Sequence, residues 1–230
     1  MKGETALIVG AGSGLSASIA RAFRREGLKC VLAARRTDKL KALCDEIGAT
    51  SIACDCSQYD QVSALFAQLD TLCDGPKVVV YNASGRVRGP LVELDPKQVA
   101  DAIAVTAYGG FLVAQAAAKR MLKKGAGTII FTGASASVKG YAQSATFAMG
   151  KFALRGLAQS MARELAPQNI HVAHVVIDGG ISSAQRPVPR DKPDSLLEPD
   201  AIAQSYVHLL KQQRSAWTWE IEVRPWVEKF

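Results

Sequence analysis

The sequence predicts an α/β fold in which a doubly wound parallel sheet of about seven strands carries helices on both faces. Short, continuously apolar runs alternate with segments of helical spacing along the chain. Strands that are covered on both faces show such runs, whereas half-exposed strands alternate apolar and polar residues. The 230 residues contain no evident linker and no internal repeat. We therefore expect a single domain over residues 1–230, a common size for α/β folds.

Seven apolar runs are the expected strands. The fourth is the clearest, because three valines and a tyrosine follow its first residue, a lysine. The last run alternates two tryptophans, Ile221 and Val223 with polar residues, which indicates one buried face, against either the monomer core or a partner subunit. In chain order the strands are expected at Thr5–Val9, Lys29–Ala33, Ser51–Cys54, Lys77–Tyr81, Thr128–Thr132, Asn169–Ile177 and Trp217–Val223.

Six segments between these runs have the spacing of helices. The first places Leu15, Ile19 and Phe23 on one side. Thr37 can cap the second, and in the fourth Asp95 precedes a first-turn proline, which is typical of a helix start. The helices are expected at Ser13–Glu26, Thr37–Ile47, Gln58–Leu72, Pro96–Lys123, Ser144–Leu165 and Pro199–Leu210.

Composition excludes several classes of protein. The chain is 48% hydrophobic and 21% charged, unlike a disordered chain. It has no uninterrupted apolar run of membrane-spanning length and no signal-peptide cleavage site, so we expect no membrane association. Five cysteines without zinc spacing indicate free thiols, no metal site and a cytoplasmic location. The net charge is +7, but the basic residues form no stripe with aromatics, so we expect no nucleic-acid partner.

A glycine-rich turn is the first functional signal. Gly10, Gly12, Ser13 and Gly14 follow the first strand and open the first helix. Glycines at this place let backbone N–H groups approach a diphosphate at the helix N-terminus, as in Rossmann-type dinucleotide-binding domains. The alternative is an ordinary tight turn.

The end of the second strand carries Arg35 and Arg36 and no acidic residue. In this architecture the strand end meets the adenosine ribose, where a carboxylate would favour NAD. Guanidinium groups suit a phosphate instead, so this pair favours NADP(H). The alternative is a pair of surface arginines at a helix start.

Lys151 is the most anomalous residue, because it lies in an otherwise apolar stretch of helix. Lysine is almost never fully buried without a partner. Phe147 lies one turn earlier on the same helix face. The Lys151 side chain therefore either lies in a ligand pocket or extends along the helix to reach solvent.

These features together resemble the short-chain dehydrogenase/reductase family over nearly the whole chain. The family's Thr-Gly-x-x-x-Gly-x-Gly segment corresponds to Val9–Ser16, in which the threonine and the last glycine are replaced. Its Asn-Asn-Ala-Gly signature corresponds to Tyr81–Ser84, which keeps Asn82 and Ala83. The resemblance implies that these segments hold a nicotinamide dinucleotide and that Asp55, after the third strand, contacts its adenine.

The family segment that closes on the nicotinamide is similar to Asp178–Ser183, with Ile181 and Ser183 at its isoleucine and threonine positions. The stretch 182–199 contains four prolines and a basic triplet. It is either a substrate lid or an ordinary loop.

The catalytic set differs from that of the family. The usual Tyr-x-x-x-Lys becomes Phe147 followed by Lys151, the usual serine falls on Ala134, and the usual asparagine falls on Thr106. In the family the tyrosine donates a proton, the serine orients the substrate oxygen, and the lysine lowers the tyrosine pKa and holds the nicotinamide ribose. Enoyl reductases place their tyrosine seven residues before the lysine, and that position is Ser144 here. Only the lysine is retained.

Two functions are therefore in competition. The first is an NADP(H)-dependent oxidoreductase with altered catalytic residues, acting on an unknown small molecule. The second is a cofactor-binding pseudoenzyme that serves as a sensor or an assembly partner. Tyr108 is the best-placed substitute phenol by sequence, although helix periodicity turns it away from Thr106. Arg186, Arg190 and Lys192 point weakly to an anionic substrate.

The two longest helices, Pro96–Lys123 and Ser144–Leu165, are more apolar than contact with one sheet face requires. The resemblance implies that such helices pair across a two-fold axis, so we expect a homodimer or homotetramer.

Overall fold

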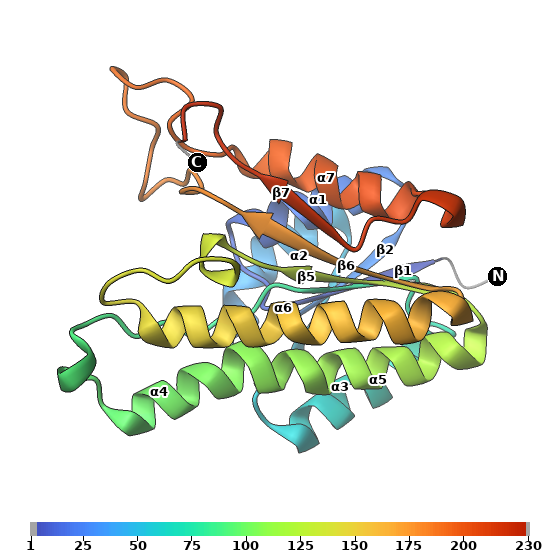
Figure 1. Ribbon diagram of the computed structural model, residues 1–230. Coiled ribbons are helices and arrows are strands. Elements are labelled where there is room, and N and C mark those ends of the chain that lie inside the picture. Colours follow the sequence, from blue (N-terminus) through green and yellow to red (C-terminus); the bar gives the residue numbers. More distant parts are fainter. Residues whose placement is uncertain (1–3, 229–230) are drawn as a thin grey trace.

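A computed structural model describes residues 4–228 and confirms the doubly wound α/β fold (Figure 1). Seven strands form one sheet in the order β3-β2-β1-β4-β5-β6-β7, and every neighbouring pair is parallel. The strands are β1 (Thr5–Val9), β2 (Lys29–Ala34), β3 (Thr50–Ala53), β4 (Val78–Tyr81), β5 (Gly127–Thr132), β6 (Ile170–Ile177) and β7 (Glu220–Val223).

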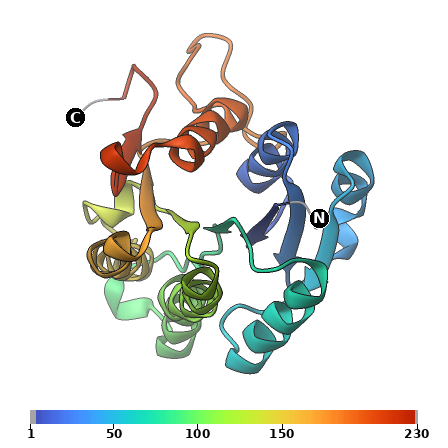
Figure 2. The same ribbon diagram turned by 90° about the vertical axis from the view of Figure 1, so that its right-hand side faces the viewer.

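The helices cover the sheet in two layers, which Figure 2 shows end-on. One layer packs its apolar side chains against one core cluster and consists of α1 (Leu15–Arg25), α2 (Lys41–Ile47) and α7 (Pro199–Lys211). The other packs against the opposite core cluster and consists of α3 (Tyr59–Leu72), α5 (Gly109–Lys124) and α6 (Ala145–Leu165). Burial of both faces explains why the strands are apolar throughout.

The strand order reverses between β1 and β4. The chain runs outward from β1 to β2 and β3, and then returns to place β4 on the other side of β1. Open α/β sheets bind ligands outside the carboxyl ends of the strands at such a reversal. The turn after β1 and the segment after β4 meet there.

The expected helix Pro96–Lys123 is interrupted. It begins as predicted, because the Asp95 carboxylate accepts a hydrogen bond from the backbone of Gln98 at 2.8 Å. However, α4 ends at Ile103 (α4, Pro96–Ile103), and a π-helical turn follows before α5. The buried Tyr81 hydroxyl donates to the Val105 carbonyl in this turn. A Cβ on Gly109 would lie 2.5 Å from that hydroxyl oxygen, so glycine is what allows the helix to approach Tyr81 so closely.

Two other expectations need correction. The Thr37 side chain makes no capping hydrogen bond, and a 3-10 turn precedes α2. The last strand begins at Glu220, not at Trp217. The Trp217 ring instead stacks on the His171 ring, with the ring centres 4.9 Å apart. Ile221 and Val223 do pack against a core cluster, as the alternation predicts.

The helical stretch 96–124 also has the length and hydropathy of a possible membrane span, with 39% of its most apolar window buried. In the structure α5 covers the sheet and α4 packs against α6, and core helices commonly have such a composition.

Candidate functional site

Two adjoining hollows lie at the carboxyl ends of the strands, and Asn82 and Ser84 line both. The first, of about 690 Å³, is bordered by the turn after β1, the end of β2 and the segment after β3. The second, of about 770 Å³, is bordered by the segments after β4, β5 and β6 and by the start of α6. The reversal of strand order thus coincides with both hollows.

The turn after β1 is held close to the segment after β4. Gly10 has a φ of +83°, and a Cβ there would lie 2.6 Å from the Cα of Ala83. The backbone N–H groups of Gly10 and Ala11 both donate to the Ala33 carbonyl, at 2.9 and 3.0 Å. Only glycine satisfies both the left-handed conformation and this approach.

Ser16, in the first turn of α1, is a residue that the sequence analysis did not select. Its hydroxyl donates to the Gly10 carbonyl at 3.0 Å and accepts from the Asn82 amide at 2.7 Å. The serine stands where the resemblance expects the last glycine of the motif. Its side chain joins the turn after β1 to the end of β4.

The remaining residues of the turn are open to solvent. Ser13 and Gly14 are exposed and Gly12 is half-buried. A Cβ on Gly12 or Gly14 would meet no heavy atom within 4 Å. This leaves room for a ligand against the start of α1, where N–H groups lack intrahelical partners and the helix dipole favours an anion.

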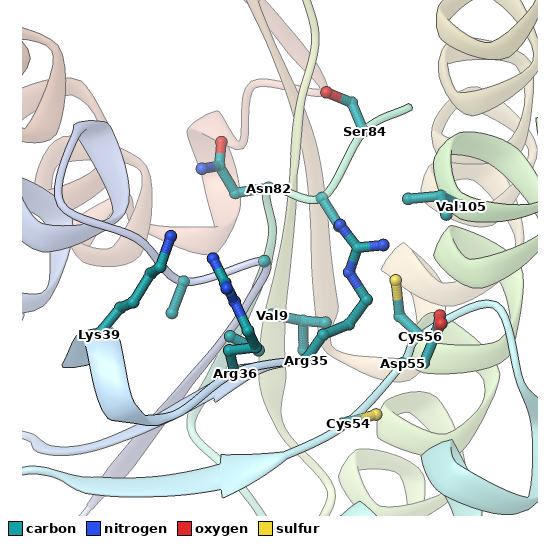
Figure 3. A pocket seen from close by; sticks show the side chains of 14 residues that line it. Val9, Arg35, Arg36, Lys39, Cys54, Asp55, Cys56, Asn82, Ser84 and Val105 are labelled. Atoms are coloured by element: carbon teal, nitrogen blue, oxygen red, sulfur yellow. The ribbon is translucent and has the colours of Figure 1, made fainter. Parts of the chain in front are cut away.

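Three cations enter the first hollow from the end of β2 and the segment after it. Figure 3 shows Arg35, Arg36 and Lys39 reaching toward the hollow. Within residues 4–228, none of the three forms an ion pair with a carboxylate. Lys39 was not selected as a site residue from the sequence, although its spacing of one helical turn from Arg35 was a usable signal.

Asp55 lies in the same hollow, in the segment between β3 and α3. One of its carboxylate oxygens accepts from the backbone and hydroxyl of Ser57, at 3.0 and 2.7 Å. The carboxylate therefore shapes the local turn as well as bordering the hollow.

Lys151 is buried at the second hollow, with 3% of its surface exposed. Its Nζ donates to the Thr132 carbonyl at 2.7 Å and lies 5.7 Å from the centre of the Phe147 ring. Burial lowers its pKa from 10.5 to about 8. Of the two alternatives, the structure places Lys151 in a pocket.

Phe147 lines the second hollow beside Ala134, so both expected positions are brought together with Lys151. The Arg86 guanidinium lies over the Phe147 ring, with its carbon 4.8 Å from the ring centre. Hydroxyl groups are present in the wall, but from other residues: Ser84, Thr132, Ser135, Tyr141 and Ser144. Among these, sequence spacing indicated only Ser144, as the position of the enoyl-reductase tyrosine.

A hydrogen-bonded network supports the loop that carries Ala134 and Ser135. The Ser137 hydroxyl accepts from the Ala134 backbone at 3.2 Å and contacts His174 Nε2 at 3.3 Å. His174 Nδ1 lies 2.9 Å from Glu220, which also binds Arg155 through two bonds of 2.6 Å. Burial lowers the pKa of His174 to about 4. Because Ser137 and His174 have no exposed surface, they position the loop and do not touch a ligand.

Other expected residues divide between the site and its surroundings. Ala83 lines the first hollow and Ile181 the second. Thr106 is buried outside both, where its hydroxyl accepts from the backbone of Gly85 at 2.8 Å. Tyr108 also lies outside both, half-exposed and stacked on Phe111. Ser183 borders a separate shallow hollow beside Ser18 and Arg21.

The chain matches the protein-family model described as short chain dehydrogenase over residues 4–190. A short-chain dehydrogenase from Rhodopseudomonas palustris is 36% identical, with a TM-score of 0.84 over 97% of this chain and 99% of that one. A metagenomic short-chain oxidoreductase in complex with NADP is 30% identical, with a TM-score of 0.86 over 99% of both chains. An uncharacterized oxidoreductase from Staphylococcus aureus is 27% identical over 96% of this chain and 97% of its own length.

The buried amine predicts a pH-dependent stability difference. The unfolded chain keeps an ordinary lysine pKa of 10.5, whereas the folded chain holds Lys151 at about 8. Folding therefore disfavours the charged form of Lys151. The resulting loss of stability is largest below pH 8 and decreases as the pH rises to 10.5. The free energy of unfolding of Lys151→Met minus that of wild type should be on the order of 2 kcal/mol larger at pH 7 than at pH 10. Urea denaturation at both pH values measures this difference in free energy of unfolding, and the exposed Lys119→Met is the control. The same difference at both pH values would contradict the burial argument.

Proposed function

This chain belongs to the short-chain dehydrogenase family, and from that premise we propose that it is an NADP(H)-dependent oxidoreductase with altered proton-transfer groups. The observation that carries the proposal is the pair of adjoining hollows. One combines the Gly10 turn with three cations that form no ion pair within residues 4–228, and the other contains the buried Lys151. Such a pair suits the two ends of an extended dinucleotide.

The residues of the first hollow fit the adenosine half of NADP(H). The open backbone of Gly12–Gly14, which does not line the hollow itself but directly follows the lining residues Gly10 and Ala11, would hold the diphosphate. Arg35, Arg36 and Lys39 would hold the 2′-phosphate, since guanidinium groups bind phosphate through paired charge-assisted bonds. The complex of the metagenomic relative with NADP supports this preference. Asp55 would border the adenine of the cofactor in this hollow.

The second hollow fits the reacting half. Lys151 would hold the nicotinamide ribose, with Asn82, Ala83 and Ile181 in the adjoining walls. When bound, the reduced cofactor supplies a hydride to an electrophilic carbon. The chain must then supply a proton to the substrate oxygen or leave that step to water.

Proton supply is where this chain differs from the family pattern. Phe147 has no transferable proton and Ala134 has no hydroxyl. Lys151 is a stronger acid than an ordinary lysine, because its pKa is about 8, and at neutral pH it still carries a proton. We assign proton supply to Lys151, with the hydroxyls of Ser135 and Ser144 as hydrogen-bonding groups in the wall. General acid–base catalysis typically contributes about 10²–10⁴ in rate.

The missing tyrosine and serine hydroxyls specifically favour the second candidate, a cofactor-binding pseudoenzyme. The two candidates differ in one measurement. The oxidoreductase consumes NADPH in a screen of carbonyl and enone substrates, whereas the pseudoenzyme binds NADPH in a titration and consumes none.

The cationic hollow predicts cofactor preference. Each charge-assisted hydrogen bond to the 2′-phosphate is worth about 1.5–3 kcal/mol, so NADPH should bind roughly tenfold or more tightly than NADH. Arg35→Ala should weaken NADPH much more than NADH in a fluorescence titration. Arg163→Ala, an exposed arginine in the last turn of α6, is the control for net charge. Equal affinities of the wild type for both cofactors would refute the preference.

Restoring the missing hydroxyls predicts a gain of activity. Phe147→Tyr with Ala134→Ser should create or raise ketone reduction, because a phenol beside Lys151 has its pKa lowered by the positive charge. Phe147→Tyr alone should do less, since the substrate oxygen then lacks its second hydroxyl. NADPH absorbance reports the rate. Rapid reduction of simple ketones by the wild type would show that another donor already performs this step.

The outer faces of α5 and α6 support a homo-oligomer. Phe111 and Leu122 on α5, and Met149 and Phe152 on α6, are 39–54% exposed. Apolar residues gathered on neighbouring helices are typical of an interaction surface. We propose a homodimer or homotetramer built on these helices. We also propose a location in a reducing cytoplasm. Residues 182–199 are proposed to form a lid that places Arg186 at the second hollow.

Sedimentation should therefore give at least twice the mass of one 24.5-kDa chain at micromolar concentration. Phe111→Glu with Phe152→Glu should shift the protein toward monomer, because each buried carboxylate would lack a partner. Tyr59→Glu alters an exposed aromatic on α3 and should leave the mass unchanged. A single-chain mass for the wild type would overturn the assembly.

A further inference from the structure

The second hollow has an unusual balance of charge. Its wall contains four cationic side chains, Arg86, Arg88, Lys151 and Arg186, and no aspartate or glutamate from the described part of the chain. Lys151 is already engaged with the Thr132 carbonyl. The three arginines remain to be explained.

These arginines are not neutralised within residues 4–228. None of them appears in an ion pair with a carboxylate. The arginines that border two smaller hollows differ in this respect. Arg21 binds Glu46 through bonds of 2.6 and 2.7 Å, and Arg120 binds Asp70 through two bonds of 2.6 Å.

The cations come from two segments that are tied to the fold. Gly85, which precedes Arg86, donates to Thr106, and a Cβ on it would lie 2.5 Å from the Cα of Ala102. Gly89, which follows Arg88, donates to the Gln143 carbonyl at 3.2 Å. On the other side, the Arg186 guanidinium lies directly against Gly180. The backbone is therefore fixed at the points from which these exposed side chains reach the hollow.

The reacting centre lies beside these charges. Arg86 covers the Phe147 ring, and Lys151 contacts the same ring. An anion bound by Arg86 and Arg88 would thus sit next to the position where the substrate oxygen meets Lys151.

We propose that the substrate of this site is a carbonyl compound that carries a carboxylate or phosphate group, bound by Arg86 and Arg88 with Arg186 closing on it. This inference rests on the proposed oxidoreductase function. A guanidinium donates two parallel hydrogen bonds to either anion, and the bond is stronger because both partners are charged. The cofactor's phosphates have their own partners in the first hollow.

The test uses the NADP⁺-loaded protein, which cannot reduce a ketone, so that binding is measured without turnover. Calorimetry compares 4-acetylbenzoate with its methyl ester and with 4-acetylphenyl phosphate. A narrower pair of compounds, 4-oxopentanoate and its methyl ester, is used in case the pocket is too small for the aromatic compounds. At least one anion should bind tenfold or more tightly than its neutral ester, and the carboxylate-to-phosphate ratio identifies the anion.

Variants locate the effect. Arg86→Gln with Arg88→Gln should weaken anion binding at least tenfold, leaving ester binding and NADP⁺ binding unchanged. Arg163→Gln removes an exposed arginine in the last turn of α6 that does not line the hollow, and should change none of the three.

Three outcomes would overturn the inference: equal binding of acids and esters, no binding of any anion, or an equal loss of NADP⁺ affinity in the double variant. The last would assign these arginines to the cofactor. If the wild type binds no NADP⁺ at all, the proposed function fails separately, and the acid-to-ester ratio on the free protein then decides the inference.

Discussion

The contact between the Gly10 turn and Ala83 is the constraint on which the rest of the site depends. It brings the end of β1 against the end of β4, where the strand order reverses. Ser16 locks the two segments together through the Gly10 carbonyl and the Asn82 amide. Because Asn82 lines both hollows, this one contact sets how the first hollow meets the second. A side chain at Gly10 would force them apart.

A buried amine is the second organising feature. Lys151 donates a hydrogen bond to the Thr132 carbonyl, and burial lowers its pKa to about 8. Such a residue costs stability and persists in folded proteins mainly where it serves a ligand. Phe147, at the position where the resemblance expects the proton-donating phenol, has the Arg86 guanidinium over its ring and the Lys151 amine 5.7 Å from its ring centre. The ring therefore lies close to two cationic groups.

The surrounding fold supplies rigidity from outside the hollows. The π-helical turn brings the Val105 carbonyl to Tyr81, and Thr106 holds Gly85 from the same turn. A continuous hydrogen-bonded network supports Ala134 on the opposite wall. It runs from Arg155 through Glu220 and His174 to Ser137. The neutral state of His174 at pH 7 follows from its burial. None of these groups needs to touch a ligand in order to fix where the lining residues stand.

The sequence by itself determined the parallel sheet, most element positions, the Gly10 turn, the Asp95 cap and the anomaly of Lys151. These depend on local patterns: apolar runs, helix caps, or a residue type in the wrong surroundings. Tertiary structure alone decided that Thr106 and Ser183 lie outside the hollows, that Ser16 bonds Asn82, and that Arg86 covers Phe147. Each of these is set by how elements distant in the chain pack together, and sequence spacing carries no information about which side chains meet across two strand ends.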